Sequence, residues 1–490
     1  MLSRGQMLAD LTSRTFDVLV IGGGITGAGI ARDAVMRGLS VALIDKGDFA
    51  SGTSSRSSRL IHGGVRYLEH GHLRLVFEAS AERHRLLRLA PDLVHPLSFT
   101  WPVYRGQRLS LTTLRAGLSL YDALSLFRNV GRHRTLDPEA LVAVEPAVRR
   151  ELLVGGVQYH DAATDDTRLT LANVLDARRR GAVVANHVVF MGAAPDSGEA
   201  VRLARVEDAL DGTRAEIRAI VIVNAAGPWS DAVRALAASD SDRRVQGSKG
   251  VHIAVPRNRV GNAGAITMLH PRDGRVMFIL PAGTQAIIGT TDTFTTVSPD
   301  EVRADEADVR YLLDGGNASF PDARLDRADV IAAWAGIRPL LPTKGSSVGA
   351  TREHQIRTHG RTVTITGGKL TTYRVMASQV VDVVQRLLRR PVRRADTGRE
   401  LLMLARPATR ADSQEIVPGL PYRMDAIGFA VESEMASTLG DLLIRRTHVA
   451  YETRDNGRAA ARRVAALLGW DAKEIERYDG EVARIFSIDP

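Results

Sequence analysis

The fold is decided by the stretch FDVLVIGGGITG, which runs from Phe16 to Gly27. The apolar run Phe16–Ile21 predicts a buried strand, and the glycines that follow it have the spacing G-x-G-x-x-G. Small apolar residues at helical spacing over Ala28–Arg37 predict a helix, and Ser40–Ile44 predicts a second strand. We therefore expect an α/β protein with a Rossmann-like domain that begins with this strand-helix-strand unit.

A unit of this kind binds the pyrophosphate of a dinucleotide at the start of its helix. Gly22 permits the tight turn, Gly24 lets backbone N–H groups approach the phosphates, and Gly27 allows the helix to pack against the strand. Ile25 and Thr26 lie at the same helix start. We expect all five residues to contact the cofactor.

The acidic residue after the second predicted strand completes the fingerprint. Asp45 follows Gly22 by 23 positions, where its carboxylate can accept a hydrogen bond from a ribose 2′-hydroxyl and would repel a 2′-phosphate. The fingerprint indicates a dinucleotide but does not distinguish NAD from FAD. A glycine-rich turn without a ligand is the alternative.

Two later strand-to-turn units are expected to lie along the same cofactor. Ala219–Val223 leads to a turn that contains Gly227, and Thr362–Thr366 leads to a turn with Gly368, Lys369, Leu370 and Thr371. We find no second strand with a G-x-G-x-x-G turn downstream. The sequence therefore predicts one dinucleotide bound by this route.

Length and composition limit the class of protein. A chain of 490 residues suits two or three domains, and 44% hydrophobic with 25% charged residues is typical of a soluble globular protein. Cysteine is absent, which excludes disulfides, Cys-ligated zinc and iron-sulfur clusters, so redox chemistry would need a bound cofactor. Met1–Thr15 lacks the apolar core of a signal peptide, and we expect a cytoplasmic protein.

The charge balance favours an anionic partner. Lys and Arg total 65 against 56 Asp and Glu, a formal net charge of +9, which suits a phosphorylated substrate, an anionic membrane surface or nucleic acid. The basic residues are spread along the chain, which argues against nucleic acid. The apolar spacing over Leu109–Phe127 favours an amphipathic helix at a membrane surface, with packing inside the protein as the alternative.

Four further blocks carry a family resemblance. Ser51–Glu69, Ile288–Asp292, Gly336–Leu340 and Gly367–Arg374 occur in the same order in, and closely resemble, FAD-dependent glycerol-3-phosphate dehydrogenase. This family belongs to the flavoproteins built like D-amino-acid oxidase, and the resemblance extends over about Phe16–Ala377. It implies FAD as cofactor and oxidation of sn-glycerol 3-phosphate to dihydroxyacetone phosphate. It also implies electron transfer to membrane quinone by a protein peripherally attached to the inner face of the cell membrane.

The resemblance also implies a domain organisation. An FAD-binding domain is interleaved with an α+β substrate cap and followed by a C-terminal helical domain. We expect the FAD-binding domain to comprise residues 1–95, 151–240 and 351–395, the cap to comprise 96–150 and 241–350, and the helical domain to comprise 396–490.

Further site residues follow from the resemblance. The expected FAD contacts outside the glycine turn and the two later turns are Thr53, Ser54, Ser55, Ser58, His62 and Gly63. The expected substrate-binding residues are Arg66, Tyr67, Arg338, Arg352 and Lys369, since a phosphate dianion requires fixed cations. The expected catalytic residues are His62, His252, Lys369 and Arg338, with either histidine as the base. No metal site is expected. For each histidine, a purely structural role is the alternative.

Several alternatives stay open. The same fold could support a glycerol-3-phosphate oxidase that reduces O2 to H2O2, or an amino-acid oxidase. A basic flavin-containing module that binds nucleic acid or membrane without turnover is a hypothesis from another class. The sequence does not determine the electron acceptor, the identity of the base, the segment that contacts the membrane or the oligomeric state, for which a homodimer is one hypothesis.

Overall fold

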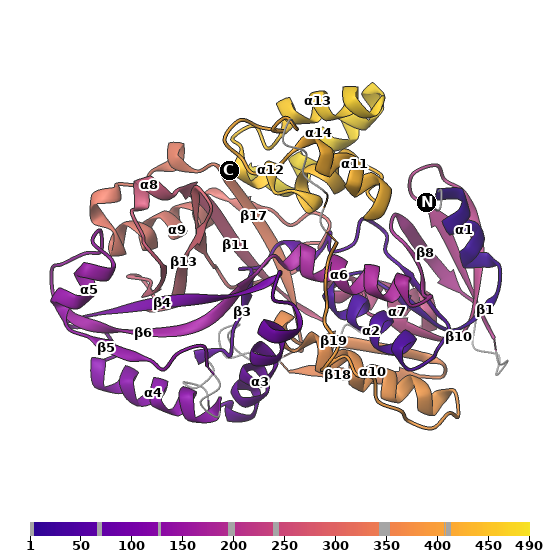
Figure 1. Ribbon diagram of the computed structural model, residues 1–490, viewed down its shortest axis with the longest axis horizontal. Helices are drawn as coiled ribbons and strands as arrows, with labels where there is room; N and C mark the ends of the chain where they lie inside the picture. The colour runs from indigo at the N-terminus through magenta and orange to yellow at the C-terminus, as the bar shows by residue number, and fades with distance from the viewer. Residues whose placement is uncertain are drawn as a thin grey trace.

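The computed structural model describes residues 4–65, 71–125, 129–194, 201–238, 245–342, 353–405, 407 and 413–490. Two large sheets lie side by side, and the C-terminal helices cover the junction between them (Figure 1). Each sheet is built from segments that are far apart in the sequence. This is the interleaved arrangement that the resemblance implied.

The first sheet contains the Rossmann-like unit. Its strand order is β18-β19-β10-β1-β2-β7, in which β1, β2, β7, β10 and β19 are parallel. The strands are β1 (Thr15–Ile21), β2 (Val41–Ile44), β7 (Val183–Ala185), β10 (Arg214–Asn224), β18 (His354–His359) and β19 (Thr362–Gly367), with β8 (Val188–Ala193) and β9 (Arg202–Asp208) attached through β10. The predicted strands over 16–21, 40–44, 219–223 and 362–366 are confirmed.

Both faces of this sheet are covered. Val18 and Val20 of β1 belong to the core under α2 (Ile25–Met36), α6 (Asp166–Arg179) and α10 (Tyr373–Leu387). Leu19 and Ile21 belong to the core on the other side, which includes residues of α1 (Arg4–Thr12) and α7 (Ser230–Ala238). Because alternate side chains of a strand point to opposite faces, the continuous apolar run of β1 fits a strand buried on both sides.

The second sheet has the order β15-β11-β14-β13-β12-β4-β6-β3, with β17 paired to β11 and β5 to β6. Its strands are β3 (Leu60–Ile61), β4 (Val94–Tyr104), β5 (Arg134–Leu136), β6 (Leu153–Thr164), β11 (Gln246–Pro256), β12 (Ala265–Leu269), β13 (Val276–Ala282), β14 (Gln285–Gly289), β15 (Thr293–Thr295) and β17 (Ala332–Leu340). Its associated helices are α3 (Leu73–Leu89), α4 (Leu111–Leu124), α5 (Pro138–Val144), α8 (Arg257–Val260) and α9 (Glu306–Ser319). β3 and β6 belong to this sheet, although they lie in stretches that the sequence analysis expected in the FAD-binding domain. The limits of the domains remain predictions.

Helix α4 packs inward rather than presenting its apolar face outward. Leu114, Leu118 and Tyr121 are buried in the core that also contains Val157 and Tyr159 of β6. Phe127, the end of the expected amphipathic stretch, lies outside the described residues. Internal packing therefore accounts for the apolar spacing of this helix.

The C-terminal segment forms α11 (Met424–Ser433), the short helix η8 (Asp441–Arg446), α12 (Val449–Glu452), α13 (Arg458–Leu468) and α14 (Ala472–Phe486). α13 ends at Gly469, whose φ of +67° closes the helix. The final strand β20 (Ile488–Asp489) pairs with β16 (Ala304–Asp305).

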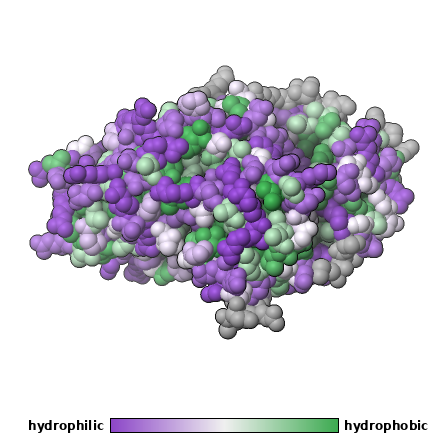
Figure 2. Space-filling model, turned by 90° about the horizontal axis from the view of Figure 1, so that it is seen from above, coloured by the Kyte–Doolittle hydropathy of each residue, from purple (hydrophilic) through white to green (hydrophobic). Residues whose placement is uncertain are grey.

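Figure 2 looks onto the face that carries the C-terminal helices and shows hydrophobic residues in small groups separated by hydrophilic ones. Among the described residues, none of the helices combines the length and the apolar character required to cross a bilayer.

Gly27 offers a test of the packing that shapes the first turn. A Cβ added to Gly27 would overlap the Gly22 carbonyl oxygen, whereas a Cβ on Gly117 of α4 would meet nothing within 4 Å. We expect Gly27→Ala to destabilise the protein by about 1–3 kcal/mol or more through overpacking. Gly117→Ala should leave stability unchanged or raise it by about 0.5–1 kcal/mol, since alanine favours helix. Thermal unfolding of both variants measures the difference, and equal melting temperatures would contradict this account.

Candidate active site

One elongated cavity connects the two sheets. It consists of two adjoining cavities that share seven lining residues, which are Ile25, Thr53, Ser54, Pro339, Gly368, Lys369 and Leu370. One half contains Asp45 and the glycine turn at the carboxyl end of β1, and the other contains His252 and Arg338 of the second sheet. Carboxyl ends of parallel strands are the usual place for a ligand in such a sheet.

The glycine turn is shaped by close backbone contacts. Gly22 has a φ of +107°, and a Cβ there would lie 2.7 Å from the Ala225 carbonyl oxygen, so only glycine fits. The first N–H of α2, from Ile25, donates to Ser54 Oγ at 3.0 Å. Helix α2 begins at this cavity with a positive dipole end, which favours a phosphate group.

Asp45 is held by the same turn. Its carboxylate accepts hydrogen bonds from the N–H groups of Gly23 (2.6 Å) and Gly47 (2.9 Å). Burial raises the pKa of Asp45 to about 6, and the two backbone hydrogen bonds oppose the shift without cancelling it. The carboxyl group therefore sits at the cavity in a position to accept from a polar ligand.

The structure brings most of the expected cofactor contacts to the cavity wall. These are Gly22, Gly24, Ile25, Thr26, Asp45, Thr53, Ser54, Ser58, His62, Gly227, Gly368, Lys369 and Leu370. The other four expected contacts support the wall from behind. Gly27 packs against Gly22, and the Ser55 hydroxyl donates to the Gly52 carbonyl. Gly63 N–H donates to Asp161, and the Thr371 hydroxyl hydrogen-bonds to the backbone N–H and carbonyl of His62. The contacts of all these residues with a cofactor remain predictions.

This half of the cavity suits FAD. An extended dinucleotide needs a long cavity, N–H groups for its pyrophosphate and an acceptor for its ribose, and the glycine turn, Ser54 and Asp45 supply these along one wall. Lys369 belongs to both halves of the cavity, at the position between the dinucleotide turn and the second sheet.

Arg338 on β17 is fixed beside the second half of the cavity. Its guanidinium donates to the Thr290 hydroxyl at 2.8 Å and to the Thr291 carbonyl at 3.2 Å. Asp292 lies 3.5 Å from the same guanidinium and is buried. A guanidinium held in this way can recognise a phosphate without first losing side-chain freedom.

His252 on β11 is buried and uncharged. Its Nε2 lies 2.8 Å from Ser58 Oγ, and its ring stacks on Trp334 with 5.6 Å between the ring centroids. Burial, followed by repulsion from Arg338 and Arg59, lowers the pKa of His252 to about 3. Its Nδ1 is buried and has no hydrogen-bond partner among the described residues.

The remaining expected residues divide into two groups. His62 is half-buried, lines the same half of the cavity as His252, and is anchored through its backbone to Thr371. Arg66, Tyr67 and Arg352 lie outside the described residues, so their substrate contacts remain predictions.

The sequence analysis missed the aromatic wall of this half. Phe99 and Trp101 on β4, Tyr159 on β6 and Phe278 on β13 line the cavity, and Phe99 stacks on Tyr159 at 5.2 Å between centroids. Phe99 and Trp101 are two positions apart on one strand, so the period of two could have placed them on one face. Which face meets the cavity depends on strand pairings that the sequence did not reveal.

Comparisons with known proteins agree with this geometry. Residues 17–374 match the model of the FAD dependent oxidoreductase family, and residues 361–475 match the C-terminal domain of alpha-glycerophosphate oxidase. A glycerol-3-phosphate dehydrogenase of Synechocystis is 34% identical over 96% of this chain and 96% of its own. The structure of a glycerol-3-phosphate dehydrogenase from Bacillus halodurans complexed with FAD aligns with a TM-score of 0.77 at 28% identity, covering 99% of this chain and 98% of that one.

A further solved structure shares the fold. L-alpha-glycerophosphate oxidase from Mycoplasma pneumoniae, with FAD bound, aligns with a TM-score of 0.61 at 18% identity, over 80% of this chain and all of that one.

The pKa of Asp45 predicts how FAD binding depends on pH. Ribose hydroxyls donate to the ionised carboxylate, so FAD favours the charged form and its affinity should rise as pH increases through about 6. Between pH 7 and pH 5 we expect the dissociation constant of FAD from the apoprotein to increase, by at most about tenfold per pH unit for one proton. Flavin fluorescence titrations measure it.

Two variants isolate the contribution of this carboxyl group. Asp45→Asn should bind FAD more weakly and without this pH dependence, whereas Asp322→Asn, which changes an exposed carboxylate, should behave like the unmodified protein. An affinity of the unmodified protein that stays constant from pH 5 to pH 7 would refute the assignment.

Proposed function

Since this chain belongs to the glycerol-3-phosphate dehydrogenase family of FAD dependent oxidoreductases, we propose that it oxidises sn-glycerol 3-phosphate to dihydroxyacetone phosphate. The chain is an FAD-dependent enzyme by its family. The observation that carries the choice of substrate is the fixed Arg338 guanidinium beside the uncharged His252, in a cavity continuous with the dinucleotide turn. One group suits a phosphate, and the other suits a hydroxyl proton.

Phosphate binding is assigned to the cations of the second half of the cavity. Among the described residues, the Asp292 carboxylate lies 3.5 Å from the Arg338 guanidinium and also accepts a hydrogen bond from Ser248. The aromatic wall keeps the site poor in water, which strengthens attraction between a phosphate dianion and a guanidinium. Arg66, Tyr67 and Arg352 are proposed as further substrate ligands on the basis of the family resemblance.

Proton removal is assigned to His252, with His62 as the second candidate. FAD held at the glycine turn, Ser54 and Asp45 would supply the acceptor for the hydride that leaves C2 of the alcohol. A neutral imidazole can accept the hydroxyl proton at its unprotonated nitrogen, and Nε2 of His252 lies 2.8 Å from Ser58 Oγ beside the same cavity. A phosphate dianion beside Arg338 would offset the repulsion that lowers the pKa of His252 and so make it a stronger base.

Lys369 is proposed to stabilise negative charge that develops during the reaction. It precedes the short helix η7 (Leu370–Thr372) and lines both halves of the cavity. A compact ammonium at that position lies between the proposed dinucleotide contacts and the proposed substrate contacts.

Membrane quinone is the proposed electron acceptor, with the enzyme held peripherally at an anionic membrane surface on the cytoplasmic side. An exposed cluster in the last turn of α10 and just after it supports the surface contact. Arg386, Arg389, Arg393 and Arg394 make no ion pair within the described part of the chain, while Arg390 pairs with Asp17 at 2.7 Å. The arginines are thus less evenly spread than the sequence analysis supposed. A homodimer and the absence of nucleic acid binding stay predictions.

Oxygen is the competing acceptor. The match of residues 361–475 to a C-terminal domain of alpha-glycerophosphate oxidase favours it as the second candidate. Hydrogen peroxide formed per substrate oxidised distinguishes the two, being near one for an oxidase and near zero for an enzyme that uses quinone.

The proposed reaction predicts anaerobic reduction of the flavin. Glycerol 3-phosphate should bleach the visible flavin absorbance, and glycerol at the same concentration should not, because glycerol lacks the phosphate that Arg338 binds. Arg338→Gln should raise the concentration needed for half-maximal bleaching by roughly 10- to 100-fold. This factor corresponds to the loss of about 1.5–3 kcal/mol, the contribution of a hydrogen bond to a charged group. Stopped-flow absorbance measures both.

Arg214→Gln is the matched control, since Arg214 is an exposed arginine that pairs with Glu207 at the edge of the first sheet. It should leave the reduction unchanged. Flavin that stays oxidised with glycerol 3-phosphate would contradict the proposed function, while FAD binding would be unaffected by that result.

The arginine cluster predicts binding to anionic vesicles. Changing Arg386, Arg389, Arg393 and Arg394 together to Gln should weaken partition onto vesicles that contain phosphatidylglycerol by roughly 10²- to 10³-fold, at about 1 kcal/mol for each arginine. A variant with Arg214, Arg272, Arg303 and Arg327 changed to Gln has the same net charge and should bind like the unmodified protein. Cosedimentation measures partition, and equal binding of the two variants would exclude the cluster as the contact.

A further inference from the structure

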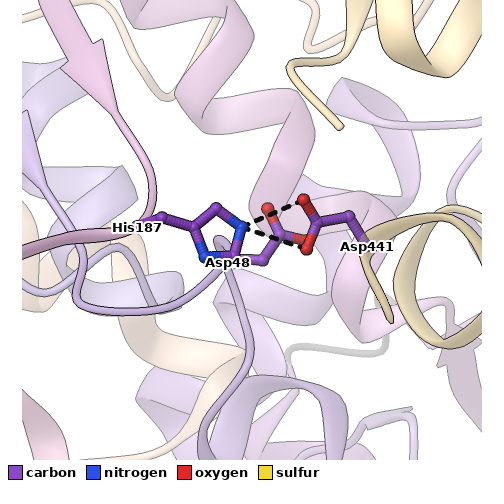
Figure 3. A group of neighbouring side chains, drawn as sticks. All are labelled: Asp48, His187 and Asp441. Carbon is purple, nitrogen blue, oxygen red and sulfur yellow. Dashed lines mark hydrogen bonds and ion pairs between the residues drawn. The ribbon is translucent and has the colours of Figure 1, made fainter. Parts of the chain in front are cut away.

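A buried group of charged residues joins the C-terminal segment to the loop that follows β2. Asp48 from this loop, His187 from the turn between β7 and β8, and Asp441 from η8 lie together (Figure 3). The two aspartates are at most 1% exposed. Residues separated by 139, 254 and 393 positions thus meet in one place, which makes the group a contact between distant parts of the chain.

Two arginines of η8 balance the carboxylates. Arg446 donates to both oxygens of Asp48 at 2.6 and 3.0 Å, and Arg445 donates to Asp48 at 2.8 Å and to Asp441 at 2.9 Å. The possible ligand atoms of Asp48, His187 and Asp441 lie within 4.8 Å of one another, as in a metal site. Since the guanidinium groups already bind the carboxylates, we assign this group to ion pairing and not to a metal.

His187 provides a second link to the same loop. Its backbone N–H donates to the Gly47 carbonyl at 2.7 Å, and its ring Nε2 lies 3.0 Å from the Asp441 carboxylate. Burial alone would lower the pKa of His187, but the Asp441 and Asp48 carboxylates together outweigh burial and raise it. The C-terminal segment therefore holds the loop through both Asp48 and Gly47.

The loop transmits this anchoring to the dinucleotide turn. Phe49, next to Asp48, is buried so close to Gly23 that a Cβ on Gly23 would lie 2.6 Å from its ring. Ala50 N–H donates to the Gly23 carbonyl at 3.1 Å, and Gly23 N–H donates to Asp45. A shift of Asp48 would consequently displace the turn and the proposed ribose ligand together.

We propose that Asp48 and Arg446 are positioning residues for FAD, through which the C-terminal helical segment holds the 45–50 loop in the conformation that binds the adenosine half of the cofactor. The inference rests on the proposed placement of FAD against Asp45. Its consequence is that the C-terminal segment, which lines no part of the dinucleotide half of the cavity among the described residues, still determines how tightly FAD is bound.

The C-terminal segment also contacts the loop that contains Thr53, Ser54 and Ser55. Tyr451 of α12 is buried, and its hydroxyl donates to the Ser55 carbonyl at 3.0 Å. Its ring meets Trp334 edge-on at 5.0 Å between centroids, and Trp334 in turn stacks on His252. The segment thus supports the walls of both halves of the cavity.

The test compares two buried carboxylates, each bound by an arginine through two hydrogen bonds. Asp48→Asn disturbs the contact with the loop, whereas Asp17→Asn disturbs the pair of Asp17 with Arg390 (2.7 and 3.1 Å), which joins the start of β1 to the segment after α10. For the full-length protein, flavin fluorescence gives the dissociation constant and the release rate of FAD. Thermal unfolding of the apoprotein gives the structural cost of each change.

We expect both variants to lower the melting temperature of the apoprotein, and only Asp48→Asn to raise the dissociation constant of FAD by tenfold or more, with faster release. Equal changes in FAD affinity for the two variants would overturn the proposal, because a purely structural contact would affect both alike. If Asp48→Asn does not fold, Arg446→Lys, which keeps the charge but loses the two-nitrogen contact, is judged by the same tenfold criterion. These readouts need no substrate, so they are independent of whether glycerol 3-phosphate is oxidised.

Discussion

The structure depends on the close approach of three backbone segments at the carboxyl end of β1. The turn at Gly22 touches the main chain after β10, and Gly27 brings α2 against the same turn, contacts that any side chain would prevent. Because the parallel strands all end at this edge, Asp45 after β2 and Lys369 after β19 arrive at one cavity with the first N–H groups of α2. The close backbone contacts at Gly22 and Gly27 thus help to position Asp45, Lys369 and the first N–H groups of α2 around the cavity.

In the second half of the cavity, one physical cause has two effects. Aromatic side chains such as Phe99 and Tyr159 exclude water, and a poorly screened environment strengthens the attraction of the Arg338 guanidinium for an anion. The same burial penalises a charged imidazole and keeps His252 neutral beside Arg338 and Arg59. The burial that would favour phosphate binding at Arg338 therefore also keeps His252 able to accept a proton.

The C-terminal segment is tied to the two-sheet body by charges that are costly to bury. Desolvation of Asp48 and Asp441 is offset only where Arg445, Arg446 and His187 stand in one arrangement, so the group tolerates little displacement. Apolar packing of Tyr451 on Trp334 adds contact area but less directional constraint. Ion pairs therefore define the relative position of the segments, and the packing fills the space between them.

The sequence by itself determined the Rossmann-like unit, the dinucleotide fingerprint with Asp45, and the family, because each depends on residues close together in the chain whose spacing reflects local geometry. It predicted the end of β1 and the turns at Gly227 and Gly368, but it left open whether the apolar face of α4 meets a membrane or packs inside the protein, and that face packs inward. Only the tertiary structure decided that Phe99 and Tyr159 face the cavity and that Arg446 reaches Asp48. These contacts join residues that are distant in sequence, and strand pairing and burial across the whole chain, not local pattern, bring them together.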